Sequence, residues 1–189
     1  MTGRTHLAAG IFTGEILAIS TNQTEIAPIV FSVCMAAVGS LLPDIDHPSS
    51  MLTKSSRSTK MLSDSITAVT KHRGFTHTIV FVALAVALAN YILLDKVSFS
   101  KLLVEALCAG MLSHLLLDTL NEKGIMWLWP FYRQPMHIAC IRTGSKAEEV
   151  FRVFMNVCAT VTLGYMIYMY SAPVVTKGVA YVNNLLQPR

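Results

Sequence analysis

Charged residues are scarce in this chain. Only 14% of its 189 residues are Asp, Glu, Lys or Arg, whereas 53% are hydrophobic. Soluble domains carry about a quarter charged residues, so this chain has too little polar surface to cover a water-soluble core of its size. The composition disfavours a soluble domain and predicts an integral membrane protein.

Several sequence signals of other protein classes are also missing. The four cysteines occur singly, without a C-x-x-C pair, so we interpret them as small buried hydrophobic residues. No P-loop or G-x-S-x-G elbow is present. No nucleic-acid motif accompanies the net charge of +4, and we expect no nucleic-acid partner. The apolar stretch near the N-terminus lacks a clear cleavage pattern and is expected to remain as a first membrane helix.

Five apolar stretches alternate with polar segments. A membrane-spanning helix needs about 17–25 residues, which the third to fifth stretches reach or nearly reach, while the second is marginal and the first is short. We therefore expect an all-α integral membrane bundle of four to five transmembrane helices with two long cytoplasmic loops. The stretches are Leu7–Ser20, Ile26–Leu42, Thr78–Leu94, Leu102–Leu120 and Val153–Ala172. We expect the last helix to stop before Pro173, because proline cannot continue the backbone hydrogen bonds.

The distribution of basic residues predicts the topology. If all five stretches span the membrane, the N-terminus and the long polar segments His47–His77 and Asn121–Arg152 share one side. Every Lys and Arg then lies on that side, except Lys96, Lys101, Lys177 and Arg189. Because short loops rich in Lys and Arg normally face the cytoplasm, we expect both loops there and the C-terminal tail outside.

Eight His and Asp residues lie at or just beyond the ends of the apolar stretches, and they were not used to derive the topology. All eight nevertheless fall on the predicted cytoplasmic side: His6, Asp44, Asp46, His47, His72, His77, His114 and Asp118. Imidazole and carboxylate groups are common metal ligands, and ionisable side chains at membrane depth usually have a function. Their convergence predicts a metal site at the inner membrane interface.

Each motif has a simpler interpretation beside the metal site. His114 and Asp118 share a helix face, but they could merely hydrogen-bond to one another. The segment Pro43–His47 supplies oxygen and nitrogen ligands, or it is a solvated turn. His6 could cap a helix. In Lys71–His77, Arg73 suits a phosphate, or it anchors the loop at the membrane surface.

The chain resembles a known family at these residues and at an aromatic segment of the kind found at membrane boundaries. The matching elements, in chain order, are Thr5-His6, Gly39 through Leu41-Leu42-Pro43-Asp44-Ile45-Asp46-His47, His72-Arg73-Gly74-Phe75-Thr76-His77, His114-Leu-Leu-Leu-Asp118 and Gly124 through Trp129-Pro130-Phe131. The family is the YdjM-type family of bacterial inner-membrane metal-dependent hydrolases. The resemblance covers residues 1–131. It implies a membrane-embedded hydrolase with a ligand pattern similar to that of zinc phospholipase C.

These observations lead to a functional hypothesis. We expect one domain over residues 1–189, with the metal-site core in residues 1–131 and an additional membrane helix and tail in residues 132–189. It would hydrolyse a phosphoester of a lipid or membrane-associated substrate at the cytoplasmic face of the inner membrane. One or two divalent ions are expected, Zn²⁺ before Mn²⁺ or Mg²⁺. A non-enzymatic metal-binding protein, either a transporter or a sensor, is the alternative.

The expected site residues fall into two groups. The metal ligands are His6, Asp44, His47, His77, His114 and Asp118, and the catalytic residues are Asp46, His72 and Arg73.

Overall fold

The computed structural model describes residues 1–23, 25–47, 50, 53, 74–94 and 96–185. These residues form five α-helices and two short 3-10 helices, and they contain no β-strand. The elements are α1 (Gly3–Ser20), α2 (Ile26–Leu41), η1 (Leu42–Asp46), η2 (Phe75–His77), α5 (Ile79–Leu93), α6 (Ser100–Thr119) and α7 (Lys146–Leu185). The predicted all-α class is confirmed.

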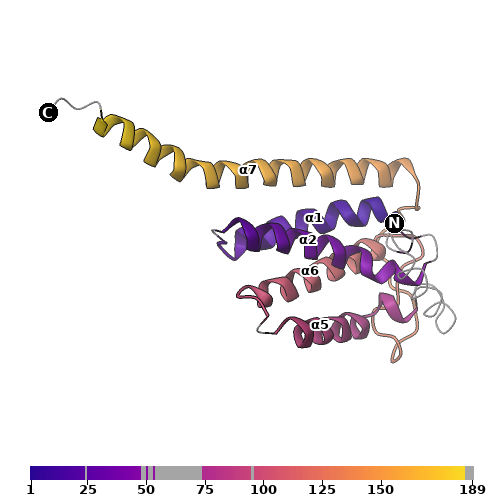
Figure 1. The fold of residues 1–189 in the computed structure, drawn as a ribbon. Helices are drawn as coiled ribbons and strands as arrows, with labels where there is room; N and C mark the ends of the chain where they lie inside the picture. The colour runs from indigo at the N-terminus through magenta and orange to yellow at the C-terminus, as the bar shows by residue number, and fades with distance from the viewer. Residues whose placement is uncertain (24, 48–49, 51–52, 54–73, 95, 186–189) are drawn as a thin grey trace.

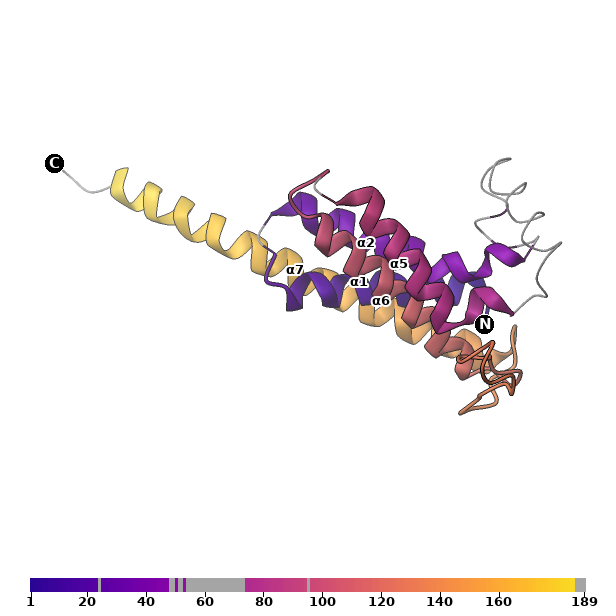
Figure 2. The same ribbon diagram turned by 90° about the horizontal axis from the view of Figure 1, so that it is seen from below.

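The helices lie side by side in a bundle, with α5 and α7 at its two edges (Figure 1). Helix α6 is the most enclosed, because 72% of its apolar window is buried, compared with 11% for that of α7. Both views show α7 running along α1 and continuing past the other helices (Figure 2). A side chain on the inner face of α6 can therefore meet groups from several elements.

Small residues allow α2 and α6 to approach one another closely. A Cβ atom at Gly110 would collide with the backbone of Ala36, and one at Gly39 would collide with the backbone of Leu107. Helix pairs in membranes commonly use small residues in this way, because backbone contact gains van der Waals attraction where there is no water to drive association. The close approach brings the end of α2 next to the inner face of α6.

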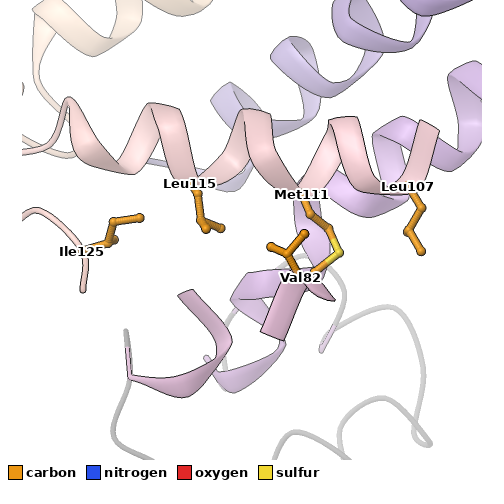
Figure 3. Packing of buried hydrophobic residues seen from close by; sticks show 5 residues of the cluster. All are labelled: Val82, Leu107, Met111, Leu115 and Ile125. Atoms are coloured by element: carbon orange, nitrogen blue, oxygen red, sulfur yellow. The ribbon is translucent and has the colours of Figure 1, made fainter. Parts of the chain in front are cut away.

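The apolar core extends along the other side of α6. Leu107, Met111 and Leu115 contact Val82 of α5 and Ile125 from the segment that follows α6 (Figure 3). The three α6 residues are spaced by four, so they form one stripe on the helix. This stripe holds α5, and with it η2, against the C-terminal half of α6.

Among the residues that the structure describes, three helical stretches are long and apolar enough to cross a membrane: Ile26–Asp46, Ser100–Thr119 and Lys146–Ser171. Helix α5 is shorter, with 15 residues, or about 22 Å at 1.5 Å per residue. Its outer face is nevertheless apolar, since Leu84 and Leu88 are both exposed. Such a face is suited to contact with lipid tails.

The last helix differs from the prediction at both ends. We expected Val153–Ala172, but α7 begins at Lys146 and continues through Pro173 to Leu185. At its start, the Ser145 hydroxyl accepts a hydrogen bond from the Glu148 backbone N–H at 3.3 Å, which is a helix-capping contact. A membrane helix can accommodate an internal proline, often by bending at it, so the proline need not end the helix.

Candidate metal centre

Six of the predicted site residues meet at one end of the bundle. His6 comes from the first turns of α1, Asp44 and Asp46 from η1, His77 from η2, and His114 and Asp118 from the last turns of α6. In Figure 1 these element ends lie together near the N-terminus. The three imidazoles are fully buried, whereas the Asp44 side chain is 19% exposed. Four separate elements thus build a buried cluster of nitrogen and oxygen atoms with one solvent-accessible member.

Two imidazoles and two carboxylates form the centre of this cluster. The Nε2 atoms of His77 and His114 are 3.3 Å apart. Asp44 Oδ1 lies 3.6 Å from the first and 3.8 Å from the second. Asp118 Oδ2 approaches from α6, at 3.7 Å and 4.0 Å from the same two nitrogens. Four potential ligand atoms therefore surround one small volume.

The backbone of α2 determines the tautomer of His114. Its Nδ1 lies 2.6 Å from the carbonyl oxygen of Ser40. A carbonyl only accepts hydrogen bonds, so Nδ1 must carry the proton and donate it. In the neutral ring, Nε2 then presents its lone pair towards His77 and the carboxylates. The close packing of α2 on α6 thereby orients a potential metal ligand.

A short relay determines the tautomer of His77. The Thr76 hydroxyl donates to Asp46 Oδ2 at 2.8 Å, and His77 Nδ1 lies 3.0 Å from the same hydroxyl oxygen. Since the one hydroxyl proton goes to Asp46, the oxygen must accept from His77 Nδ1–H. His77 Nε2 therefore also presents a lone pair, and Asp46 lies on the opposite edge of the ring from the other ligands. Metal-binding histidines are commonly held by such outer carboxylates.

The donor set fits a divalent cation. Two imidazole lone pairs and two carboxylate oxygens face the same volume. A single proton could form a hydrogen bond between only two of these four atoms, whereas a cation can bind all four. A tetrahedral metal with bonds of about 2.0–2.2 Å holds its ligand atoms roughly 3.3–3.6 Å apart. The two central imidazole nitrogens are 3.3 Å apart, and their four distances to the Asp44 and Asp118 oxygens are 3.6–4.0 Å. Residues His77, His114, Asp44 and Asp118 could close on an ion with small movements.

His6 extends the cluster on its other side. Its ring stacks on that of His114 with centroids 3.7 Å apart, and its Nε2 lies 3.2 Å from Asp118 Oδ1. The Met1 amino group also donates to this oxygen. Ligand atoms of His6, Asp44 and His114 lie within 4.8 Å of one another, as do those of His77, His114 and Asp118. The two groups share His114, whose one free lone pair serves one ion, so a second ion would need a carboxylate that bridges both ions.

The remaining predicted residues lie elsewhere. His47 follows η1 and belongs to neither ligand group of the described residues. His72 and Arg73 lie outside the described part of the chain, and their assignments stay predictions. His137, which we did not assign to the site, is exposed in the segment between α6 and α7.

Glu148 supports the site, although the sequence reasoning did not include it. Its buried carboxylate accepts hydrogen bonds from the Thr5 hydroxyl at 2.7 Å and from the Gly144 N–H at 2.6 Å. It also accepts from the Thr2 N–H at 2.5 Å. These contacts tie the start of α7 to the first turn of α1, next to His6. The Ser-x-x-Glu pattern at Ser145 is a capping-box signal that could have identified Glu148.

Comparison with known proteins independently supports a membrane location for this chain. A model of the YdjM inner membrane protein family matches residues 1–181. An uncharacterized Bacillus subtilis protein, YvsG, is 32% identical over 90% of this chain and 95% of its own length. The inner membrane protein YdjM of Escherichia coli is 32% identical over 79% of this chain and 76% of its own length. No solved structure matches the chain significantly. By the extent of the family match and these identities, the chain belongs to the YdjM inner membrane protein family.

Proposed function

We propose that this protein is a metal-dependent hydrolase that cleaves a phosphoester of a lipid or membrane-associated substrate at the cytoplasmic face of the inner membrane. The observation that carries the proposal is the 3.3 Å contact between two imidazole nitrogens. Both rings donate from Nδ1 to fixed acceptors, so both lone pairs converge on the same buried volume as two carboxylates. Converging lone pairs are costly without a cation, and this supports a bound metal.

The ligand roles follow from position. His77, His114, Asp44 and Asp118 would hold the principal ion. A second ion would be held by His6 together with a bridging carboxylate, because the single free lone pair of His114 serves only one ion. The Ser40 carbonyl and the Thr76–Asp46 relay would keep the two central imidazoles in their metal-binding tautomers. We therefore assign Asp46 to positioning His77, in place of the catalytic role that we expected from the sequence.

The metal would supply the chemistry and the chain would supply orientation. A bound divalent cation activates water and polarises a phosphoryl oxygen, and nitrogen and carboxylate ligands suit Zn²⁺ better than Mg²⁺. Asp44 is the ligand nearest to solvent, so substrate would approach from its side. His72 and Arg73, proposed from the sequence alone, would complete the site as a proton-transfer group and a phosphate-binding group.

The location of the cluster weighs against a metal transporter, one form of the non-enzymatic alternative. Transporters usually hold their ions near the membrane midplane, on interrupted helices. Here His114 and Asp118 lie in the last turns of α6, and η1 and η2 lie beyond the ends of their neighbouring helices. A site at the membrane boundary can reach lipid headgroups. It is a poor location for moving an ion across the bilayer.

Metal content and hydrolysis test the proposal together. We expect protein purified in detergent without chelators to contain a divalent metal by mass spectrometry. It should also hydrolyse a phospholipid or a chromogenic phosphodiester. Asp118→Asn should lose both properties, because it removes one ligand charge. Glu105→Gln is the matched control on α6, since Glu105 is exposed and pairs with Lys101.

The outcomes separate the possible functions. Metal that binds without any hydrolysis would favour the non-enzymatic alternative, a transporter or a sensor. Protein that contains no metal, and takes up none when Zn²⁺ or Mn²⁺ is added, would refute the metal centre itself.

A further inference from the structure

A backbone hairpin borders the metal centre. Ile125 and Met136 form an antiparallel pair, with the Ile125 N–H donating to the Met136 carbonyl at 3.1 Å and the Met136 N–H donating back at 2.8 Å. Gly124, at the base, has a φ of +59°, a value that glycine adopts at little cost. The Ile125 side chain is buried against α6. The residues between the pair form a tip on a defined base.

This hairpin contacts both segments that carry the central imidazoles. On the α6 side, Trp127 Nε1 donates to the Thr119 hydroxyl at 2.8 Å, directly next to Asp118. On the other side, the Ile79 N–H donates to the Trp127 carbonyl at 3.0 Å, two residues after His77. Phe75 of η2 also contacts Trp129 edge-to-face, with centroids 6.0 Å apart. A ligand held on this hairpin would therefore lie beside the metal centre.

The exposed side chains of the hairpin tip are mostly apolar or aromatic. Phe131 is 90% exposed, and Leu128 and Tyr132 are about half exposed. Arg133 is exposed in the same tip. A cluster of exposed aromatic and aliphatic side chains marks an interaction surface, and aromatic residues next to a basic one suit the membrane–water boundary. The tip has the composition of an element that inserts among lipid headgroups.

A groove of about 540 Å³ lies between the hairpin and α6. Its lining includes Trp127, Met136 and Ile138 from the hairpin side and Leu116 from α6. Leu116 and Ile138 are 56% and 82% exposed. The groove is thus continuous with the outward surface of a helix that is long and apolar enough to cross the membrane. In an integral membrane protein that surface faces lipid tails, so the bilayer itself supplies the occupant of the groove.

We propose that the Ile125–Met136 hairpin inserts its tip into the leaflet beside the metal centre, and that the groove against α6 holds an acyl chain of a phospholipid. The headgroup of that lipid would then lie at the level of Asp118, since α6 ends one residue later at Thr119. This inference assigns a phospholipid-binding element to the chain. Taking the bound phospholipid as the substrate rests, in addition, on the proposed hydrolase function.

Tryptophan fluorescence reports on this hairpin alone, because Trp127 and Trp129 are the two tryptophans of the chain. The full-length Trp129→Phe variant, in vesicles of phosphatidylethanolamine and phosphatidylglycerol, leaves Trp127 as the sole probe. We expect its emission to be quenched by phospholipids that carry bromine on the acyl chain near the headgroup. Bromine near the terminal methyl group should quench less, and aqueous iodide should quench least.

Phe131→Ser tests the insertion of the tip, and Phe154→Ser on the exposed face of α7 is the matched control. We expect only the first variant to shift the emission to longer wavelength and to reduce the quenching by brominated lipid. Circular dichroism confirms that both variants are folded. Stronger quenching by iodide than by any brominated lipid, or equal effects of the two variants, would overturn the inference.

The test is independent of catalysis. Fluorescence quenching needs neither metal nor turnover, so a protein without metal could still show lipid-inserted tryptophans, and only the proposed function would then fail. A water-exposed hairpin on a metal-loaded protein would refute the lipid-binding element alone.

Discussion

Replacing Thr76 with valine should weaken metal binding without removing any ligand. The side chain of valine has nearly the same shape but neither donates nor accepts a hydrogen bond. Thr76 accepts from His77 Nδ1 and donates to Asp46, with distances of 3.0 Å and 2.8 Å. Without the hydroxyl, the His77 ring is free to change its tautomer and present a proton at Nε2. The variant therefore isolates the orientation of the imidazole from its presence.

The expected loss can be estimated from comparable sites. Groups that orient a metal-binding histidine typically contribute about 10–100-fold to metal affinity, which corresponds to roughly 1.4–2.7 kcal/mol. Because Thr76 is buried, no bulk water can replace the lost hydroxyl easily. Removing the hydrogen bond to the Asp46 carboxylate would also destabilise the folded protein by about 1–3 kcal/mol. The lost orientation of His77 and the lower stability of the folded protein both weaken zinc binding.

Zinc affinity can be measured by competition with a chromophoric chelator, using metal-stripped protein in detergent. Thr76→Ser is the matched control, since it keeps the hydroxyl and should bind zinc like the wild type. His77→Ala gives the effect of losing the ligand itself. Thermal unfolding without metal shows whether a weaker affinity reflects a less stable protein.

A Thr76→Val variant that binds zinc as tightly as Thr76→Ser would contradict the tautomer reasoning, provided that His77→Ala weakens binding. If His77→Ala also has no effect, His77 is not a ligand and the arrangement of the centre proposed above is wrong.

Three further predictions concern packing and topology. Gly110→Ala should lower the unfolding temperature in detergent, at a cost of about 1–3 kcal/mol, because the new methyl group would collide with the backbone of Ala36. The control Gly164→Ala has no neighbour near the new methyl group and should be neutral or slightly stabilising. Equal effects of the two variants would contradict the close packing of α2 on α6. Glu148→Ala should cost about 3 kcal/mol by leaving its buried donors unpaired and should reduce metal affinity, and an unchanged unfolding temperature would show that the contact is dispensable. A single cysteine at Ser55 in a cysteine-free chain should react with a membrane-impermeant maleimide only from the cytoplasmic side, and labelling from outside would reverse the topology.

Much of the fold could be predicted because membrane helices are marked by local composition. Long apolar runs separated by polar turns located α2, α5 and α6 to within a few residues. The predicted start and end of α7 were wrong, for two different reasons. Its first turn is polar and depends on a cap at Ser145, and the helix continues through Pro173, which a membrane helix can accommodate without ending.

In the candidate site, too, some features were predictable from the sequence and others were not. Residue type and topology were sufficient to predict that His6, His77, His114 and Asp118 meet at one end of the bundle. The position of Asp46 was not predictable, because it lies only two residues from Asp44 and the pair could face the same volume. In η1 the two carboxylates instead reach different edges of the His77 ring. Thr76 has a hydroxyl that is no typical metal ligand, and Glu148 lies far from the other candidates in the sequence, so neither was predicted to support the site.

Membrane residence, the helical bundle and the candidate ligand residues thus follow from the amino-acid sequence, because hydrophobicity and residue chemistry are properties of single residues and short runs. Contacts between distant elements set the remaining features. The Ser40 carbonyl can orient His114 only after α2 packs on α6, and Trp127 can reach Thr119 only after the hairpin folds back. Metal sites need distances correct to tenths of an ångström, and such distances arise from packing between helices.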